Sequence, residues 1–157
     1  MASLLRLKKL KLTLVVLSST LLLLFPPIPA ADVKYCDNNI DYAVKVHGVK
    51  ISPDPVVIGK PATFNISAST GQDIPGGKVV IKVSYYGLHV HTETHNLCEE
   101  ISCPIAAGNF VLSHSQTLPA FAPPGSYTLK MTMEDKHQLL TCISFNFKIS
   151  LFSVSAD

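Results

Sequence analysis

The sequence lacks the short motifs that commonly mark a catalytic centre. It contains no Gly-x-Ser-x-Gly elbow, no His-Glu-x-x-His pair and no glycine-rich phosphate loop. Two pairs of adjacent carboxylates occur, Glu99-Glu100 and Glu134-Asp135. On a strand, adjacent side chains point to opposite faces, so these pairs are more typical of turn and solvent charges than of an acid–base pair. The sequence therefore predicts neither an enzyme nor a cofactor site.

Long apolar runs are also absent after the first 30 residues. Arg6, Lys8, Lys9 and Lys11 precede an apolar stretch, Leu12–Phe25, that is shorter than the roughly 20 residues a membrane span needs. Residues 1–30 are therefore predicted to be a signal peptide, with an uncleaved signal anchor as the alternative. From residue 31 onward nine Lys and Arg stand against eleven Asp and Glu, a formal net charge of −2. No basic patch suggests nucleic acid, and residues 31–157 suit a single domain with a core over 32–149 and a short tail over 150–157.

Tryptophan is missing altogether, and no stretch after the leader shows a sustained helical period. Apolar residues instead alternate with polar ones, as in Tyr127–Glu134 and Ile143–Ile149, and Pro/Gly turns separate these segments. Six to eight such strands predict an all-β, immunoglobulin-like antiparallel sandwich of two sheets, without the buried tryptophan of an antibody domain. The residues expected on its inner faces either fill a core or line an internal hydrophobic cavity: Phe64, Ile66, Val83, Tyr85, Phe110, Leu118, Tyr127, Leu129, Met131, Met133, Phe145 and Phe147.

Four cysteines follow the leader, and an even number in an exported chain predicts a disulfide framework. Of the three possible pairings we favour Cys98–Cys103, a local clip, and Cys36–Cys142, which ties the two ends of the domain together. Closing a loop of about a hundred residues stabilises a fold by roughly 4–5 kcal/mol in the chain-entropy model.

A histidine-rich segment raises the question of a metal site. His89, His91, Glu93 and His95 would share one face of an extended strand. Same-face neighbours on a strand are about 6.5–7 Å apart, so only adjacent pairs could reach one ion. We therefore interpret the segment as a polar, solvent-facing strand edge and predict no metal.

Asn65-Ile66-Ser67 is a sequon for N-glycosylation in an exported chain. Asn65 is expected to point outward between Phe64 and Ile66, so that a glycan would be sterically acceptable. An unmodified surface asparagine is the alternative.

Three segments together resemble the ML lipid-recognition domain family, in particular its Niemann-Pick type C sterol carriers and the phosphatidylglycerol/phosphatidylinositol transfer proteins of plants. They are the Cys-Pro-Ile exit of Asn96–Ile105, the segment Gly125–Met131 with the acidic turn that follows it, and the closing Leu140–Phe145. The resemblance covers about residues 32–149 and implies the same disulfide pairing. One departure is that the third disulfide of the animal sterol carriers has no counterpart here, where the first long loop carries only Ser52-Pro53-Asp54-Pro55.

The resemblance implies that the two sheets part to admit a lipid tail or a sterol. It places Val90 and Ala120 at the mouth of the cavity, with Phe121 and Pro123 as nearby candidates. Phe121 and the Pro123-Pro124-Gly125 turn are then expected to form part of a docking rim. The implied function is a soluble, exported lipid-binding or transfer protein, acting as a monomer against a membrane surface or a lipid-accepting membrane protein. The alternative is a lipid-sensing module that presents its ligand to a receptor. Secretion and delivery to a vacuole or lysosome both remain open.

Overall fold

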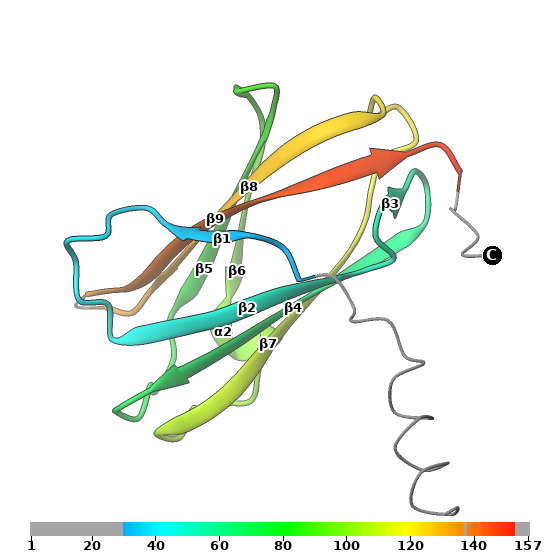
Figure 1. Ribbon diagram of the computed structural model, residues 1–157. Helices are drawn as coiled ribbons and strands as arrows, with labels where there is room; N and C mark the ends of the chain where they lie inside the picture. Colours follow the sequence, from blue (N-terminus) through cyan, green and yellow to red (C-terminus); the bar gives the residue numbers. More distant parts are fainter. Residues whose placement is uncertain (1–29, 137, 153–157) are drawn as a thin grey trace, which may run out of the picture.

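In the computed structural model two β-sheets face each other and enclose the core (Figure 1). The structure describes residues 30–136 and 138–152. The predicted signal peptide lies outside the described residues except for Ala30, and so do residues 153–157 of the predicted tail. Within the part of the chain that is described, no helix is long and apolar enough to cross a membrane.

The described residues form nine strands, whereas the sequence predicted six to eight. The larger sheet contains, in spatial order, β1 (Val33–Tyr35), β9 (Leu139–Ser150), β8 (Gly125–Glu134), β5 (Lys78–Tyr85) and β6 (Leu88–Asn96), and β3 (Val56–Val57) also pairs with β9. The smaller sheet contains β2 (Val44–Ser52), β4 (Pro61–Thr70) and β7 (Gly108–Thr117). The extra strands are the short β1 and β3, and the β3–β9 pair is parallel rather than antiparallel.

Apolar and polar side chains alternate along the strands, and the apolar ones form the core between the sheets. Every second residue of β8 from Tyr127 to Met133 is buried, because successive side chains of a strand point to opposite faces. Met131 lies directly between Ile81 of β5 and Ile143 of β9. The predicted inner and outer faces of these strands are therefore confirmed.

Two edge strands, one from each sheet, meet on one side of the sandwich. The larger sheet ends at β6 and the smaller one at β7, and rings of His95 on β6 and His114 on β7 lie 4.8 Å apart. The short helix α2 (Leu97–Glu100) follows β6 directly. The Asn96 side chain caps this helix by accepting a hydrogen bond from the Cys98 N–H, and Leu97 anchors it in the core.

The two disulfides join the cysteines as the sequence favoured. Cys36 follows β1 and is bonded to Cys142 on β9, 106 positions further along the chain. Cys98 of α2 is bonded to Cys103 in the loop after it. One disulfide ties the first strand to the last, and the other holds the α2 turn.

Asn65 lies on β4, the central strand of the smaller sheet, opposite Lys50 and Ser113. Its neighbours along the strand, Phe64 and Ile66, are buried, whereas Asn65 is half-buried. The side chain therefore belongs to the outer face of the sheet, and its glycosylation stays a prediction.

Gly77 should be intolerant of any side chain. It has a φ of +152°, and a Cβ there would lie 2.2 Å from the Glu134 carbonyl oxygen, which as backbone cannot move aside. Its own carbonyl accepts the Leu97 N–H at 2.9 Å, so a shift of Gly77 would also disturb α2. We expect Gly77→Ala to lower the free energy of unfolding by at least about 2 kcal/mol in denaturant titrations.

Gly71→Ala is the matched control, because nothing lies within 4 Å of a Cβ at that position. Its unfolding midpoint should stay close to that of the wild-type protein. Equal losses in both variants would contradict the steric argument for Gly77.

Candidate functional site

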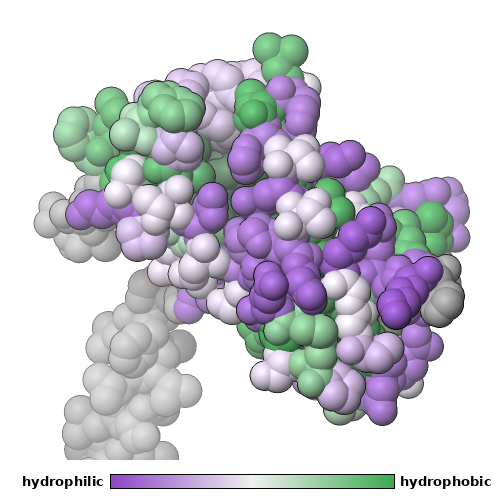
Figure 2. All heavy atoms as spheres, turned by 180° about the vertical axis from the view of Figure 1, so that it is seen from behind, coloured by the Kyte–Doolittle hydropathy of each residue, from purple (hydrophilic) through white to green (hydrophobic). Residues whose placement is uncertain are grey.

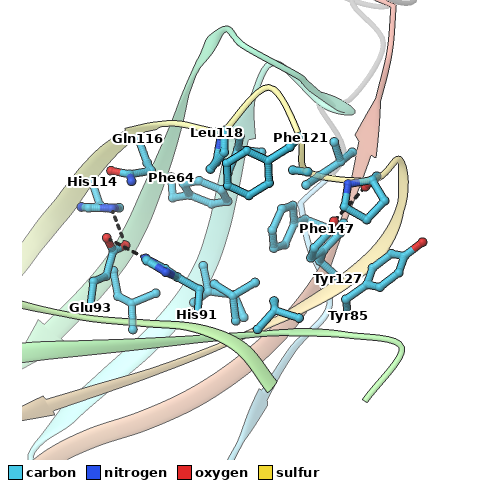
Figure 3. Close-up of a pocket in the computed structure, with 18 residues that line it drawn as sticks. Phe64, Tyr85, His91, Glu93, His114, Gln116, Leu118, Phe121, Tyr127 and Phe147 are labelled. Atoms are coloured by element: carbon cyan, nitrogen blue, oxygen red, sulfur yellow. Dashed lines mark hydrogen bonds and ion pairs between the residues drawn. The ribbon is translucent and has the colours of Figure 1, made fainter. Parts of the chain in front are cut away.

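A cavity of about 410 Å³ opens between the two sheets (Figure 3). Both sheets contribute to it: Phe64 comes from β4, whereas Leu129 and Phe147 come from β8 and β9. Apolar and aromatic side chains make up most of its wall. The apolar and aromatic residues that line it are Phe64, Ile81, Val83, Tyr85, Val90, Leu118, Pro119, Phe121, Ala122, Pro123, Tyr127, Leu129, Phe147 and Ile149.

Aromatic rings form a continuous row along this wall. Tyr85 and Tyr127 have ring centroids 4.8 Å apart, Tyr127 and Phe147 5.5 Å, and Phe147 and Phe64 5.6 Å. Such separations are those of favourable aromatic pairs. Because Phe64 belongs to the smaller sheet and the other three to the larger one, the row packs the sheets together on one side of the cavity.

Two tyrosine hydroxyls hold the loop between β7 and β8 against the cavity. Tyr127 donates a hydrogen bond to the Pro123 carbonyl at 2.8 Å, and Tyr85 donates one to the Pro124 carbonyl at 3.3 Å. Burial, and secondarily the nearby Tyr85, raise the pKa of Tyr127 above its ordinary value. Tyr127 therefore stays a neutral donor at physiological pH, and the two hydrogen bonds fix one lip of the opening.

Exposed apolar side chains gather where the cavity reaches the surface. We call Tyr86, Leu88, Val90 and Phe121 the apolar rim. The first three belong to the β5–β6 hairpin, and Phe121, which is 88% exposed, belongs to the β7–β8 loop. Figure 2 shows the molecule from behind: hydrophobic residues gather at its upper left, while hydrophilic residues cover its middle. Large exposed apolar groups around a cavity mark a surface that meets an apolar partner.

Ten of the residues named from the sequence line this cavity: Phe64, Val83, Tyr85, Val90, Leu118, Phe121, Pro123, Tyr127, Leu129 and Phe147. Three others, Ile66, Met131 and Phe145, line a neighbouring void of about 10 Å³, which is too small for more than a single water molecule. They act as core between the sheets rather than as cavity wall.

The remaining three residues line neither space. Phe110 pairs with Ala68 and Met133 with Val79, toward the ends of the strands away from the opening. Ala120 is exposed in the turn beside Phe121, so it was wrongly placed at the mouth. A position inside a loop has no strand period from which its direction can be predicted.

Sequence reasoning missed two cavity residues that the period could have revealed. Ile81 lies between Val79 and Val83 on the inner face of β5, and Ile149 follows Phe147 on the inner face of β9. Pro119 and Ala122 were also missed as wall residues, and no periodic signal marks them because they lie in the β7–β8 loop.

The structure corrects the predicted side-chain directions along the histidine-rich strand. The register of β5 with β6 shifts at Val83, which pairs with His91, whereas Ser84 pairs with His89. Val90 is the extra residue of this bulge, so His89 turns outward while His91, Glu93 and His95 face inward, toward the other sheet. The segment is a mostly exposed strand edge, as predicted, and the His91 side chain is 56% exposed, but Glu93 and His95 are half-buried rather than facing solvent.

His114 joins His91 and Glu93 at a polar end of the cavity (Figure 3), and Glu100 contacts His114. His114 of β7 is 8% exposed, and its Nε2 lies 3.3 Å from Oε1 of Glu93. Glu100 of α2 is 13% exposed and lies within 3.4 Å of a ring nitrogen of both His95 and His114. Glu100 is therefore not the solvent charge predicted, because α2 turns it inward while Glu99 stays exposed.

Comparisons with known proteins agree with this architecture. The family model of the ML domain matches residues 30–149. A putative phosphatidylglycerol/phosphatidylinositol transfer protein of Dictyostelium discoideum is 33% identical over 116 residues, which cover 71% of this chain and 80% of that protein. An MD-2-related lipid-recognition protein of Arabidopsis thaliana is 32% identical over 124 residues, which cover 73% of this chain and 75% of that protein.

Solved structures share the fold at low sequence identity. A Niemann-Pick type C2 protein from the Japanese carpenter ant superposes with a TM-score of 0.61 at 13% identity, covering 76% of this chain and 99% of that one. Chicken MD-1 complexed with lipid IVa superposes with a TM-score of 0.52 at 19% identity, covering 74% and 86%.

Proposed function

We propose that this chain, which belongs to the ML-domain family, binds the apolar part of a lipid in the cavity between its sheets and carries it between membranes. The observation that carries the proposal is the cavity of about 410 Å³ with apolar walls from both sheets. Its size falls within the roughly 300–1,000 Å³ of small-molecule sites. A phospholipid tail and a sterol both meet its chemistry.

The energetics of a lipid tail explain why such a carrier needs an exposed rim. Each buried CH₂ contributes about 0.8 kcal/mol, so a 16-carbon chain gains about 12 kcal/mol in an apolar cavity. Release of such a chain into water would be very slow. A carrier must therefore pass its lipid directly to a membrane or a lipid-accepting membrane protein, and the apolar rim supports that mode of transfer.

The relatives support the ligand class. The Dictyostelium relative is named a phosphatidylglycerol/phosphatidylinositol transfer protein, and the Arabidopsis relative is named a lipid-recognition protein. Transfer and recognition correspond to the two functions that the sequence left open, carrier and sensor. We favour the carrier because exposed large apolar side chains, Val90 and Phe121, line the cavity where a membrane could meet them.

We further propose that the protein acts in the secretory pathway, secreted or in a vacuolar or lysosomal lumen. The basic, apolar leader and the two disulfides support export, since thiols oxidise outside the cytosol. A monomeric state and the lack of enzymatic activity stay predictions.

Native mass spectrometry of the protein purified gently from a eukaryotic secretory host tests the ligand. We expect one lipid per chain, identified by extraction and fragmentation. Protein that emerges empty and stays empty after incubation with sterol-containing and phospholipid vesicles would contradict lipid binding. Transfer between labelled donor and acceptor vesicles then separates a carrier, which moves lipid catalytically, from a sensor, which only retains it.

Replacing Phe121 by aspartate tests the rim. Withdrawing a phenylalanine from an apolar phase costs about 1.5–3 kcal/mol, so transfer between vesicles should slow by roughly tenfold or more. Stability should change little, because Phe121 is already 88% exposed.

Val111→Asp is the matched control. Val111 is 52% exposed on β7 and does not line the cavity, so its aspartate variant should transfer lipid at the wild-type rate. An unchanged rate in Phe121→Asp, or equal slowing in both variants, would remove Phe121 from the docking rim.

A further inference from the structure

Four ionisable side chains form a compact cluster where β6, β7 and α2 meet. Glu93 and His95 come from β6, His114 from β7, and Glu100 from α2. The two glutamates and His114 have side chains less than 20% exposed, and His95 is 26% exposed. So many titratable groups at the edge of an apolar core need a specific chemical partner.

Glu100 contacts the same ring atom of both histidines. Its Oε1 lies 3.4 Å from His95 Nδ1, and its Oε2 lies 3.2 Å from His114 Nδ1. A carboxylate can only accept hydrogen bonds, so this arrangement favours an Nδ1–H on each imidazole. The lone pair of each Nε2 is then free.

Both Nε2 atoms are buried, and neither makes a hydrogen bond to any described residue. Each nevertheless lies close to Glu93: His114 Nε2 is 3.3 Å from Oε1, and His95 Nε2 is 3.4 Å from Oε2. The contacts are close in distance but are not aligned as hydrogen bonds. Two imidazole lone pairs and a carboxylate therefore converge, and a third imidazole lies at the outer side of the carboxylate, with the exposed His91 Nε2 3.6 Å from Glu93 Oε2.

We propose that Glu93, His95 and His114 bind a divalent transition-metal ion of the zinc class, and that Glu100 positions the two imidazoles. Two imidazoles and one carboxylate are a common ligand set for zinc, with a further position left for water. Hydrogen bonding of a ligand's second ring nitrogen to a carboxylate is the usual outer arrangement of such sites.

The distances suit such an ion. Bonds of about 2.0–2.2 Å in a tetrahedral arrangement place neighbouring ligand atoms about 3.3 Å apart. Each Nε2 already lies at about this distance from one of the two Glu93 oxygens, His114 from Oε1 and His95 from Oε2, and one ligand atom from each of the three residues lies within 4.8 Å of the others. To bring all three ligand atoms to this separation, side chains must move by about 1–1.5 Å, which small rotations of the partly exposed His95 can supply.

A bound ion would join the two sheets. Glu93 and His95 belong to the edge of the larger sheet and His114 to the edge of the smaller one. Glu93 and His114 also line the cavity, so the ion would close one side of it. A ligand that binds only the native state stabilises it by RT ln(1 + c/Kd) at a free concentration c, so the unfolding midpoint should rise with the logarithm of the Zn²⁺ concentration above Kd.

A titration with Zn²⁺ alone tests the site. The exported protein is produced without a histidine tag and stripped of metal with a chelator beforehand. Calorimetry should show one ion per chain, and Zn²⁺ should raise the thermal midpoint. Glu93→Gln and His114→Ala should each weaken Zn²⁺ binding by about 100-fold or more, since even outer-shell changes commonly cost 10–100-fold. Co²⁺ as a spectroscopic substitute should show the intense visible bands of a four-coordinate site.

His89→Ala and His47→Ala are the matched controls. Both histidines are exposed and lie outside the cluster, where each hydrogen-bonds to a hydroxyl, that of Thr92 or of Ser69, so both variants should keep the wild-type affinity. If His114→Ala fails to fold, Glu93→Gln still decides the matter, because it keeps the size of the side chain and removes only its charge.

The role of Glu100 has its own readout. Glu100→Gln should weaken Zn²⁺ binding by about 10–100-fold. In the metal-free protein, Glu100→Gln should also lower the population of the Nδ1–H tautomer of at least one of the two histidines, as measured by histidine ¹⁵N chemical shifts. A purely structural Glu100 would leave that tautomer unchanged.

Three results would overturn the proposal: no saturable Zn²⁺ binding, binding that survives Glu93→Gln, or binding lost equally in His89→Ala. Doubly protonated imidazoles in the metal-free protein, together with no Zn²⁺ binding, would identify the cluster as an ion-pair network held by protons. The outcome does not depend on whether the cavity binds a lipid.

Discussion

Replacing Val83 by tryptophan is expected to lower lipid occupancy and transfer by more than tenfold. Val83 lines the cavity on the inner face of β5, opposite Leu129 of β8. The added indole would displace part of the bound tail from a space of about 410 Å³. Excluding about three methylenes costs roughly 2.4 kcal/mol, which corresponds to about 50-fold in affinity. Native mass spectrometry and vesicle transfer both measure this loss.

Val80→Trp provides the matched control on the same strand. Val80 points to the outer face of β5, where it pairs with Thr94 and Thr132. The control should keep its lipid, and both variants should unfold cooperatively. Full occupancy in Val83→Trp with the same lipid would show that the ligand does not lie in this cavity.

Removing the Cys36–Cys142 disulfide by a double alanine substitution is expected to cause the largest loss of stability. The bond joins positions 106 apart in sequence, and the chain-entropy model then assigns it about 4–5 kcal/mol. It also holds β1 and the start of the domain against β9. The free energy of unfolding from denaturant titrations measures the loss.

The Cys98–Cys103 bond offers an internal comparison. It joins positions only five apart, for which the same model gives about 2 kcal/mol. The double alanine variant at Cys98 and Cys103 should therefore unfold at a higher denaturant concentration than the variant lacking Cys36 and Cys142. The reverse order would show that local order of α2, rather than loop closure, dominates the stability.

The fold was largely predictable because its strands obey a period of two. The inner face of β8 could be read residue by residue from Tyr127 to Met133, and all four positions are buried. The pairing of the cysteines was favoured by their positions at the ends and in the middle of the chain. β1 and β3 were missed because segments of three and two residues are too short to show a period.

The polar cluster was not predictable in the same way. A strand period assigns His89, His91, Glu93 and His95 to one face, and the spacing along a single strand then argues against a shared ion. The bulge at Val90 removes His89 from that face. The fold then brings His114 of β7 and Glu100 of α2 beside Glu93 and His95. Ligands for one ion need not follow one another in sequence.

The sequence by itself determined which residues are apolar and inward, that the chain forms two layers of strands, and where its turns fall, because these depend on alternation and on local backbone chemistry. Only the tertiary structure decided that part of the inner surface stays unfilled, and that two histidines and two glutamates meet at the edge where the layers face each other. Both depend on how far apart the sheets lie and on which strands form their edges, and these are set by long-range pairing between segments distant in the chain.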